Sequence, residues 1–480
     1  MEKASAILKK IMLAILLLIF AVTLVLVVIT GLESRSYLLA LAAGALWAAA
    51  LFYLFPRLPE PAVKPSRAAL WLTVFCFVIN LVWVLVIRIE PFSDYETYWD
   101  CARALAFVTE IPTAWYIAMY PHILGCSSFL SLFIRLFGES VLMVSVLNVL
   151  LTSLSGLLIF YICLEISSLR SACLACLLWA VCPCKLMLNS LVFSEPLYTC
   201  LVLLFVYLVM LAEKKKDIFP AEPLLCAAYG LGIGLLLRSI NIVRPIAAIL
   251  IIALFLWLVF LRGKDLRSGA QWKMWLILCA AALCVCSVTG KLWDRHVEDK
   301  VGMEPAAVPI YNIYVGFNEE TQGQWSAEDM DLLFHYMNEE GLSPTEAQEQ
   351  MLPHLRERLA SGIDFGRLFS SKLIAFLGND ELGGYTYRFT RSEVFVKICM
   401  VICNVFYYGV FLAAALGILR MAGSTALSSQ LLIPLYILGL TLAHMLVEVA
   451  NRYHYSIVPF MIILAALGFS RSGETKRSAP

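Results

Sequence analysis

The stretch "ALWLTVFCFVINLVWVLVI" (residues 69–87), closely followed by "PFSDYETYWDCARAL" (residues 91–105), decides how this chain folds. The first run holds no charged side chain and is long enough to cross a hydrocarbon core of about 30 Å as a helix. The second run brings three carboxylates and four aromatic rings within nine residues. Acids and rings directly after an apolar run are typical of a helix that leaves a membrane at its aqueous surface.

The composition of the 480-residue chain extends this interpretation to the whole protein. Hydrophobic residues make up 61% and charged residues 15% of the sequence, whereas soluble domains carry about 25% charged residues. The mean hydropathy is +0.83. The net charge of +1 gives no basic surplus for a nucleic-acid partner. We therefore expect an all-α polytopic protein that is surrounded by membrane lipids.

Thirteen apolar runs are candidate membrane spans: 11–30, 37–55, 69–87, 121–137, 141–163, 171–186, 191–211, 224–237, 242–261, 272–288, 394–418, 431–449 and 455–469. Lys and Arg near span ends mark the cytoplasmic side. They cluster at 9–10, 57–67, 214–216, 262–267 and 471–477. Both termini are then inside, which requires an even number of crossings. We expect about 12 transmembrane helices, with segment 121–137 as an interfacial or re-entrant helix.

A polar segment at 291–391 separates two membrane modules. It carries 17 acidic and 9 basic residues. The motifs "SAED" (326–329) and "SPTE" (343–346) have the form of capping boxes and predict two short helices. We expect a small, mainly helical extracytoplasmic domain here. It lies between an N-terminal transmembrane module (1–290, with a first extracytoplasmic loop at 89–120) and a C-terminal one (392–480).

The motif "SDYE" (93–96) also has the form of a capping box, in which Ser93 caps a helix and Glu96 reaches back to its backbone N–H. The following helix would place its acids on one face and Tyr95 with later rings on the other. We expect it to lie on the outer leaflet with its rings at headgroup depth. The cap leaves no structural task for Asp94, which is therefore the first catalytic candidate. Glu96 is a possible second acid.

Outward-facing cations are the candidates for binding an anion. Arg452 and His454 lie in a turn between the last two spans, where Arg452 could also be a snorkelling anchor or the partner of Glu448 on a helix. Glu448 itself is at the end of a span, where an ionisable group is costly and usually functional. Arg238 and Arg244 flank an outward break between two short spans, against the usual charge distribution, which favours phosphate binding.

The order of the motifs resembles the GT-C class of polyprenyl-phosphate-sugar-dependent membrane glycosyltransferases. The nearest branch is the bacterial protein-O-mannosyltransferase-like group, glycosyltransferase family 39. An early acid in the first outward loop is followed by "MYPHILG" (119–125), "LVFSEPLYTCLVLL" (191–204), "NIVRPIA" (241–247), "YNIYVGFNEETQGQWSAED" (311–329) and "EVANRYHYSIVPF" (448–460). Pro121-His122 stands where the family has two prolines, and two extra spans precede the usual first one.

The resemblance implies inverting transfer of a hexose or pentose from a polyprenyl-phosphate-linked donor. The acceptor would be a glycan, lipid or protein on the outer face of a bacterial plasma membrane. A carboxylate would take the acceptor proton and cations would stabilise the leaving phosphate. The implied roles are catalysis by Asp94 and Glu96, phosphate binding by Arg238, Arg244, Arg452 and His454, and substrate contact by Tyr95, Tyr120, His122, Asn318, Trp325 and Glu448.

Two matters stay open at this point. No cofactor is certain, and participation of a divalent metal is undecided because family members differ. The alternative function is a transporter or flippase of a lipid-linked sugar, which should line a path at mid-membrane with polar residues. Ionisable groups here crowd the outer ends of the spans, which favours chemistry on one side of the membrane. A non-catalytic assembly subunit would tolerate loss of Asp94.

Overall fold

A computed structural model describes residues 2–33, 35–262 and 269–470. Within these residues the secondary structure is helical and contains no strand. In these described ranges, nine helices are long and apolar enough to cross a membrane. Their bounds are α1 Glu2–Glu33, α2 Arg35–Leu54, α3 Pro65–Val86, α7 Val141–Ile166, α10 Glu195–Lys214, α11 Pro223–Val243, α13 Gly269–Val301, α18 Glu393–Gly423 and α19 Leu432–Leu446, the last extended by the 3₁₀ turn Ser429–Leu431.

The remaining apolar runs form shorter or broken helices. α8 (Leu169–Ala180) and α9 (Pro183–Asn189) meet at a 48° bend and together could make a tenth span. The three short ones are α6 (His122–Phe137), α12 (Ala247–Leu256, continued to Leu261) and α20 (Val458–Phe469). Each predicted apolar run therefore contains a helix or a bent pair, and the all-α polytopic fold is confirmed. The number of twelve crossings stays a prediction.

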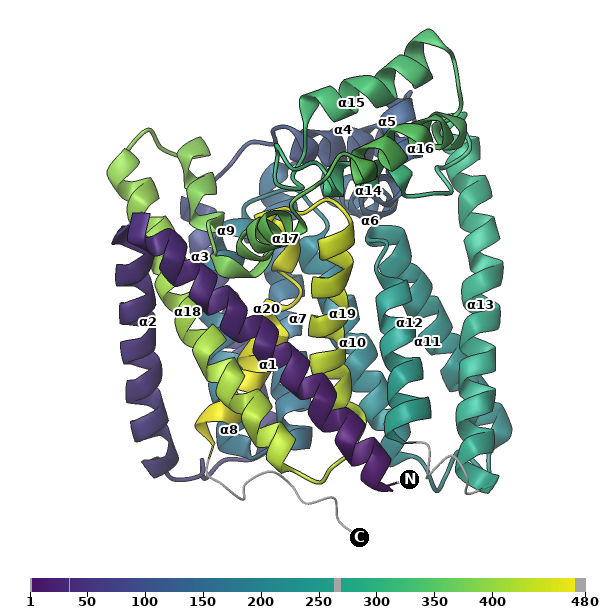
Figure 1. Ribbon diagram of the computed structural model, residues 1–480. Helices are drawn as coiled ribbons and strands as arrows, with labels where there is room; N and C mark the ends of the chain where they lie inside the picture. Colours follow the sequence, from purple (N-terminus) through teal and green to yellow (C-terminus); the bar gives the residue numbers. More distant parts are fainter. Residues whose placement is uncertain (1, 34, 263–268, 471–480) are drawn as a thin grey trace.

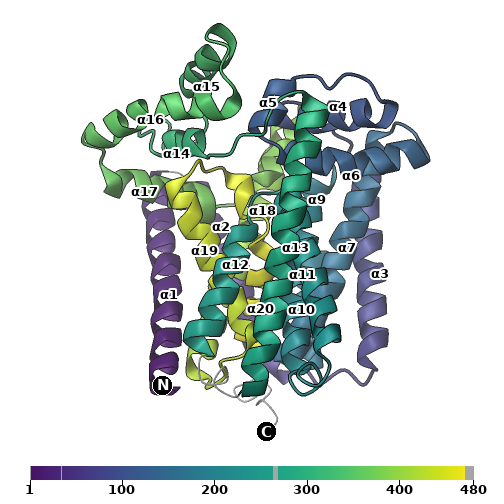
Figure 2. The ribbon, with the colours of Figure 1, turned by 90° about the vertical axis from the view of Figure 1, so that its right-hand side faces the viewer.

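The polar helices gather at one end of the bundle. These are α4 (Asp94–Phe107), α5 (Ala114–Met119), α14 (Ile310–Gly316), α15 (Ala327–Phe334), α16 (Pro344–Ala360) and α17 (Phe365–Leu373). Figures 1 and 2 show this end, called the polar end below, opposite the end at which α1 begins and α20 finishes. The basic residues at 264, 267 and 471–477 lie outside the described residues.

Helix α4 has the predicted amphipathic pattern, but its apolar face packs on protein. Tyr95 and Trp99 are buried and Glu96 is exposed. The neighbour is α6, whose Ser127 hydroxyl donates to the Tyr98 carbonyl at 2.9 Å. The apolar face of α4 is thus covered by protein, and the depth of its rings in the membrane stays a prediction.

The predicted capping box at the start of α4 is wrong. Ser93 has φ 50° and ψ −134° and its side chain makes no capping hydrogen bond. A serine N-cap needs an extended backbone, which this left-handed conformation does not provide. The box at Ser343 and Glu346 is confirmed. Ser326 also caps its helix, by accepting from the Asp329 N–H at 3.3 Å.

Helix α13 continues beyond its apolar run to Val301, so the first residues of the polar segment extend this helix. Helices α14 to α16 share a small core that includes Tyr311, Leu333 and Met351. Lys372 of α17 joins this unit to the bundle. Its Nζ donates to the carbonyls of Gly316, Met445 and Val447 at 2.7, 2.9 and 2.8 Å.

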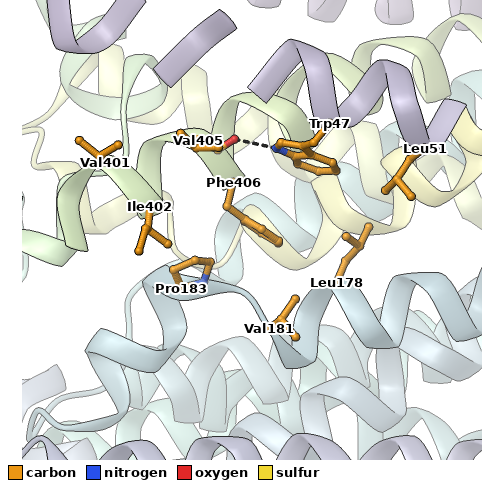
Figure 3. A pocket seen from close by; sticks show the side chains of 9 residues that line it. All are labelled: Trp47, Leu51, Leu178, Val181, Pro183, Val401, Ile402, Val405 and Phe406. Atoms are coloured by element: carbon orange, nitrogen blue, oxygen red, sulfur yellow. Dashed lines mark hydrogen bonds between the residues drawn. The ribbon is translucent and has the colours of Figure 1, made fainter. Parts of the chain in front are cut away.

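An apolar pocket of about 440 Å³ lies between α2, α18 and the α8–α9 bend. Figure 3 shows Trp47 and Phe406 facing it, with the Trp47 indole N–H donating to the Val405 carbonyl at 2.9 Å. Its nine lining residues include none of the predicted site residues.

Candidate active site

Asp94 and Arg452, which are 358 residues apart, form an ion pair at the polar end. Asp94 is the first residue of α4, and Arg452 lies in the 3₁₀ turn Asn451–His454 that precedes α20. Asp94 Oδ2 is 2.5 Å from Arg452 Nη2. The Asp94 side chain is 37% exposed and that of Arg452 is 22% exposed. The pair is therefore open to a ligand from one side.

Tyrosines surround this ion pair. The Tyr116 hydroxyl donates to Asp94 Oδ1 at 3.5 Å, and the Tyr95 hydroxyl accepts from Arg452 Nη1 at 3.5 Å. Burial raises the pKa of both phenols, so they stay protonated at neutral pH. The ring of Tyr453 lies 5.5 Å from the Arg452 guanidinium. The phenols thus fix the orientation of both charged groups without adding charge.

A second arginine shares the ring of Tyr453. The Arg244 guanidinium lies 4.7 Å from that ring and 4.0 Å from Glu195 Oε1. Glu195 is buried at the start of α10, and Arg244 directly follows α11. Two guanidinium groups that flank one ring can converge on the oxygens of a phosphate, for which their planar donors are suited. The structure thus brings Arg244 and Arg452 together.

Glu195 is a further candidate residue that the sequence interpretation missed. It was part of the quoted motif "LVFSEPLYTCLVLL" but received no role. An acid that begins a long apolar run is itself a signal, because ionisable groups at membrane depth are costly and usually functional. Its side chain is 2% exposed and faces Arg244, which explains how the charge is tolerated.

Glu448 lies next to the same cluster. Its Oε1 accepts from the Tyr453 hydroxyl at 3.2 Å, and burial raises its pKa. The alternative of a helical Glu448–Arg452 pair does not hold, because α19 ends at Leu446 and Arg452 pairs with Asp94. The segment after α19 is held by its backbone, since the Glu448 N–H donates to the Asn312 carbonyl at 2.8 Å.

Two of the predicted phosphate ligands lie elsewhere. His454 is fully buried beside the rings of Tyr407 and Phe376, and burial lowers its pKa to about 4, so it is uncharged at neutral pH. Arg238 is inside α11 and not at the break that was expected there. It donates through Nε and Nη2 to the Cys286 carbonyl of α13 at 3.2 and 2.7 Å. The structure does not bring either residue to the Asp94–Arg452 pair.

The predicted substrate contacts are likewise divided. Tyr120 stacks edge-on against Tyr116 at 4.8 Å and His122 against Tyr120 at 6.0 Å, so both adjoin the cluster. Asn318 is buried and donates to Asp329 at 3.0 Å, which gives it a structural task. Trp325 is 58% exposed on the polar segment.

A buried polar network holds the two loops that carry the acids. Asn80 Oδ1 of α3 accepts from Lys185 Nζ and from Asn189 Nδ2, both at 2.8 Å. Asn189 Oδ1 in turn accepts from Thr152 of α7 at 2.8 Å. The Ser190 hydroxyl donates to the Ile87 carbonyl at 2.8 Å. The chain before Glu195 is thus tied to the chain before Asp94.

The described residues contain no group of three or more His, Cys, Asp or Glu side chains that could together hold a metal ion. The donor set at Asp94 and Glu195 consists of two acids, each of them facing an arginine.

Two solved structures align with much of the chain. The archaeal oligosaccharyltransferase AglB from Archaeoglobus fulgidus, in complex with an inhibitory peptide and a dolichol-phosphate, aligns at 13% identity and a TM-score of 0.43. The alignment covers 83% of this chain and 50% of AglB, so the chain spans about half the length of that protein. ArnT from Cupriavidus metallidurans, bound to undecaprenyl phosphate, aligns at 13% identity and a TM-score of 0.39, over 83% of this chain and 77% of ArnT.

Sequence comparison points to one family. No curated protein matches the chain. Residues 122–290 match the family described as dolichyl-phosphate-mannose-protein mannosyltransferase. This part of the chain contains Glu195 and Arg244 but neither Asp94 nor Arg452. The match confirms the resemblance that the motifs indicated: the chain is similar to the dolichyl-phosphate-mannose-protein mannosyltransferases, a family of GT-C membrane glycosyltransferases.

Proposed function

We propose that this membrane protein transfers a sugar, with inversion, from a polyprenyl-phosphate-linked donor to an acceptor at the extracytoplasmic face of the plasma membrane. The observation that carries the proposal is the Asp94–Arg452 ion pair with Arg244 beside it. It combines a proton acceptor and two phosphate-binding cations in one partly open site. The similarity of residues 122–290 of this chain to mannosyltransferases supports the same reaction class.

The proposed step needs only these groups. The acceptor hydroxyl loses its proton to the Asp94 carboxylate while its oxygen attacks the anomeric carbon of the donor sugar. The bond between that carbon and the phosphate oxygen breaks, and polyprenyl phosphate leaves. The guanidinium groups of Arg452 and Arg244 stabilise the charge that develops on the phosphate. Attack opposite the leaving group inverts the anomeric centre.

The ion pair also couples donor binding to the freedom of the proposed base. Asp94 Oδ2 contacts Arg452 Nη2 at 2.5 Å, and a donor phosphate competes for the same guanidinium. When the phosphate draws Arg452 away, the Asp94 carboxylate is released from this contact and can bond to the acceptor hydroxyl.

The distribution of charge supports the proposed orientation of the site. The polar end holds the ion pair and helices α14–α17, whereas α1 begins at the opposite end with Lys9 and Lys10. Basic residues near span ends favour the cytoplasmic side. Cysteines placed at Gln324 and Lys215 test this assignment. An impermeant maleimide added to intact cells should label the first and not the second, and the reverse labelling would overturn the orientation.

The proposed donor is tested directly by the lipids that co-purify with the chain. Mass spectrometry of the full chain in nanodiscs should detect a polyprenyl phosphate or its sugar conjugate. The same lipid should be depleted in an Arg452→Ala sample purified in parallel. Phospholipids alone in both samples would contradict a polyprenyl-phosphate donor. Release of polyprenyl phosphate from that conjugate upon addition of acceptor would distinguish transfer from flipping, which leaves the conjugate intact.

A further inference from the structure

A second cavity adjoins the Asp94–Arg452 pair. It has a volume of about 650 Å³, within the range of about 300–1,000 Å³ that is typical of small-molecule sites. Its walls come from the ends of α11 and α13, the connection 304–309 and the start of α6. Tyr120 lines it, and the ring of Tyr120 contacts Tyr116, which donates to Asp94. Two aromatic rings thus separate the cavity from the proposed base.

The lining combines flat apolar faces with neutral hydrogen-bonding groups. Trp293, Tyr120 and Tyr311 supply the rings, and Asn241, Asn312 and Gln348 supply side-chain amides. An amide offers both donors and acceptors. Tyr311 is 1% exposed and contributes its ring to the wall.

The charges of the lining do not suit an anion. Three carboxylates, Asp294, Glu298 and Glu304, face two guanidinium groups, those of Arg238 and Arg295. The Arg238 guanidinium already donates to the Cys286 carbonyl. A phosphate would therefore meet net negative charge here. Uncharged ligands with many hydroxyl groups fit the lining better.

We propose that this cavity is a saccharide-binding site, in which Trp293 stacks on the apolar face of an uncharged sugar ring while the amides bond to its hydroxyl groups. The proposal rests on the proposed function, because the cavity then holds one of the two reacting partners. The sugar belongs either to the acceptor glycan or to the donor lipid. Both have the same recognition chemistry, so the experiment has an arm for each.

The first arm measures binding of free sugars. Saturation-transfer NMR is recorded on the full chain in nanodiscs with the methyl glycosides of mannose, glucose, galactose and N-acetylglucosamine. At least one glycoside should receive saturation, and inorganic phosphate should not displace it. Trp293→Ala should weaken that binding about ten-fold, the equivalent of losing one aromatic contact of about 1.4 kcal/mol. Trp272→Ala, which alters a partly exposed ring on the same helix outside the cavity, is the matched control and should bind as the unchanged chain does.

The second arm identifies the source of the sugar. Affinities are compared for undecaprenyl phosphate and undecaprenyl-phosphate-mannose. An advantage of the mannose-bearing lipid that Trp293→Ala removes would assign the cavity to the donor sugar. Equal affinities of both lipids in both chains, together with the loss of glycoside binding, would assign it to the acceptor.

The proposal is overturned if no glycoside binds and the mannose-bearing lipid has no advantage. It is also overturned if phosphate displaces the glycosides, or if Trp293→Ala and Trp272→Ala behave alike. Failure of the proposed function has a different signature. In that case Arg452→Ala would leave the affinity for undecaprenyl phosphate unchanged, whatever the cavity variants do.

Discussion

Replacement of Asp94 by asparagine should change turnover and donor affinity in opposite directions. Asparagine keeps the size of the side chain but cannot accept the acceptor proton, and general-base catalysis contributes about 10² to 10⁴ in rate. Turnover should fall by that factor. Donor affinity should rise, because Arg452 loses its partner at 2.5 Å and becomes free for the phosphate.

The size of the second effect follows from exposure. Asp94 is 37% exposed, so its pair with Arg452 is closer to a surface pair, worth about 1 kcal/mol at most, than to a buried one. Release of Arg452 should therefore tighten binding of undecaprenyl phosphate by up to about five-fold. Isothermal titration of the chain in nanodiscs measures this change, and release of polyprenyl phosphate from the sugar conjugate measures turnover.

Asp100→Asn is the matched control, since Asp100 lies on the same helix, is 38% exposed and pairs with Arg103 at 3.5 Å. It should change neither quantity. Loss of turnover and of affinity together in Asp94→Asn would mean that the ion pair is structural. Unchanged turnover would remove Asp94 as the base.

Three further predictions concern the surroundings of this pair. Arg452→Ala should weaken binding of undecaprenyl phosphate by about 2 to 5 kcal/mol, and Arg452→Lys should restore only part because it lacks the planar fork; equal affinity of all three chains would exclude the contact. Burial raises the pKa of Glu448, so the stability that its protonated form contributes is present at low pH and lost as pH rises through the raised pKa. Glu448→Gln should therefore raise the melting temperature at about pH 8 and leave it nearly unchanged at about pH 4, and an equal shift at both pH values would contradict the burial effect. Asn80→Leu removes the acceptor of two buried hydrogen bonds and should cost about 1–3 kcal/mol in thermal unfolding, with partial recovery in Asn80→Asp; an unchanged melting temperature would show that the network is not stabilising.

The periodicity and composition of the sequence are sufficient to predict the membrane helices of this protein. Each apolar run became a helix because a backbone in lipid must satisfy its own hydrogen bonds. The position of Tyr95 and Trp99 on the less polar face of α4 also followed from the 3.6-residue repeat, whereas their burial against protein was not predicted. The cap at Ser93 failed because tertiary packing sets the backbone there, with φ at 50°, and a local motif carries no information on that.

The sequence alone could not predict which of the candidate site residues contact one another. Asp94 and Arg452 were both selected, yet nothing in a single chain shows that residues 358 positions apart touch. Glu195 was overlooked because its partner Arg244 comes later in the chain, after α10 and α11. His454 was selected for its type and its neighbours in the sequence, but the same turn directs it into the core.

The ammonium group of Lys372 determines how a substrate can enter. To swing α17 and α14 away from α19 as a hinged cover, the chain would have to break two charge-assisted hydrogen bonds, to the carbonyls of Met445 and Val447, of about 1.5–3 kcal/mol each. Even the lower figure, about 3 kcal/mol in total, corresponds to an open fraction of less than about one in a hundred. We therefore expect the polar helices to form a fixed cover over α19, while a substrate reaches Asp94 from the side on which this carboxylate is already partly exposed. Entry of a substrate would then need no hinge motion of α14 and α17.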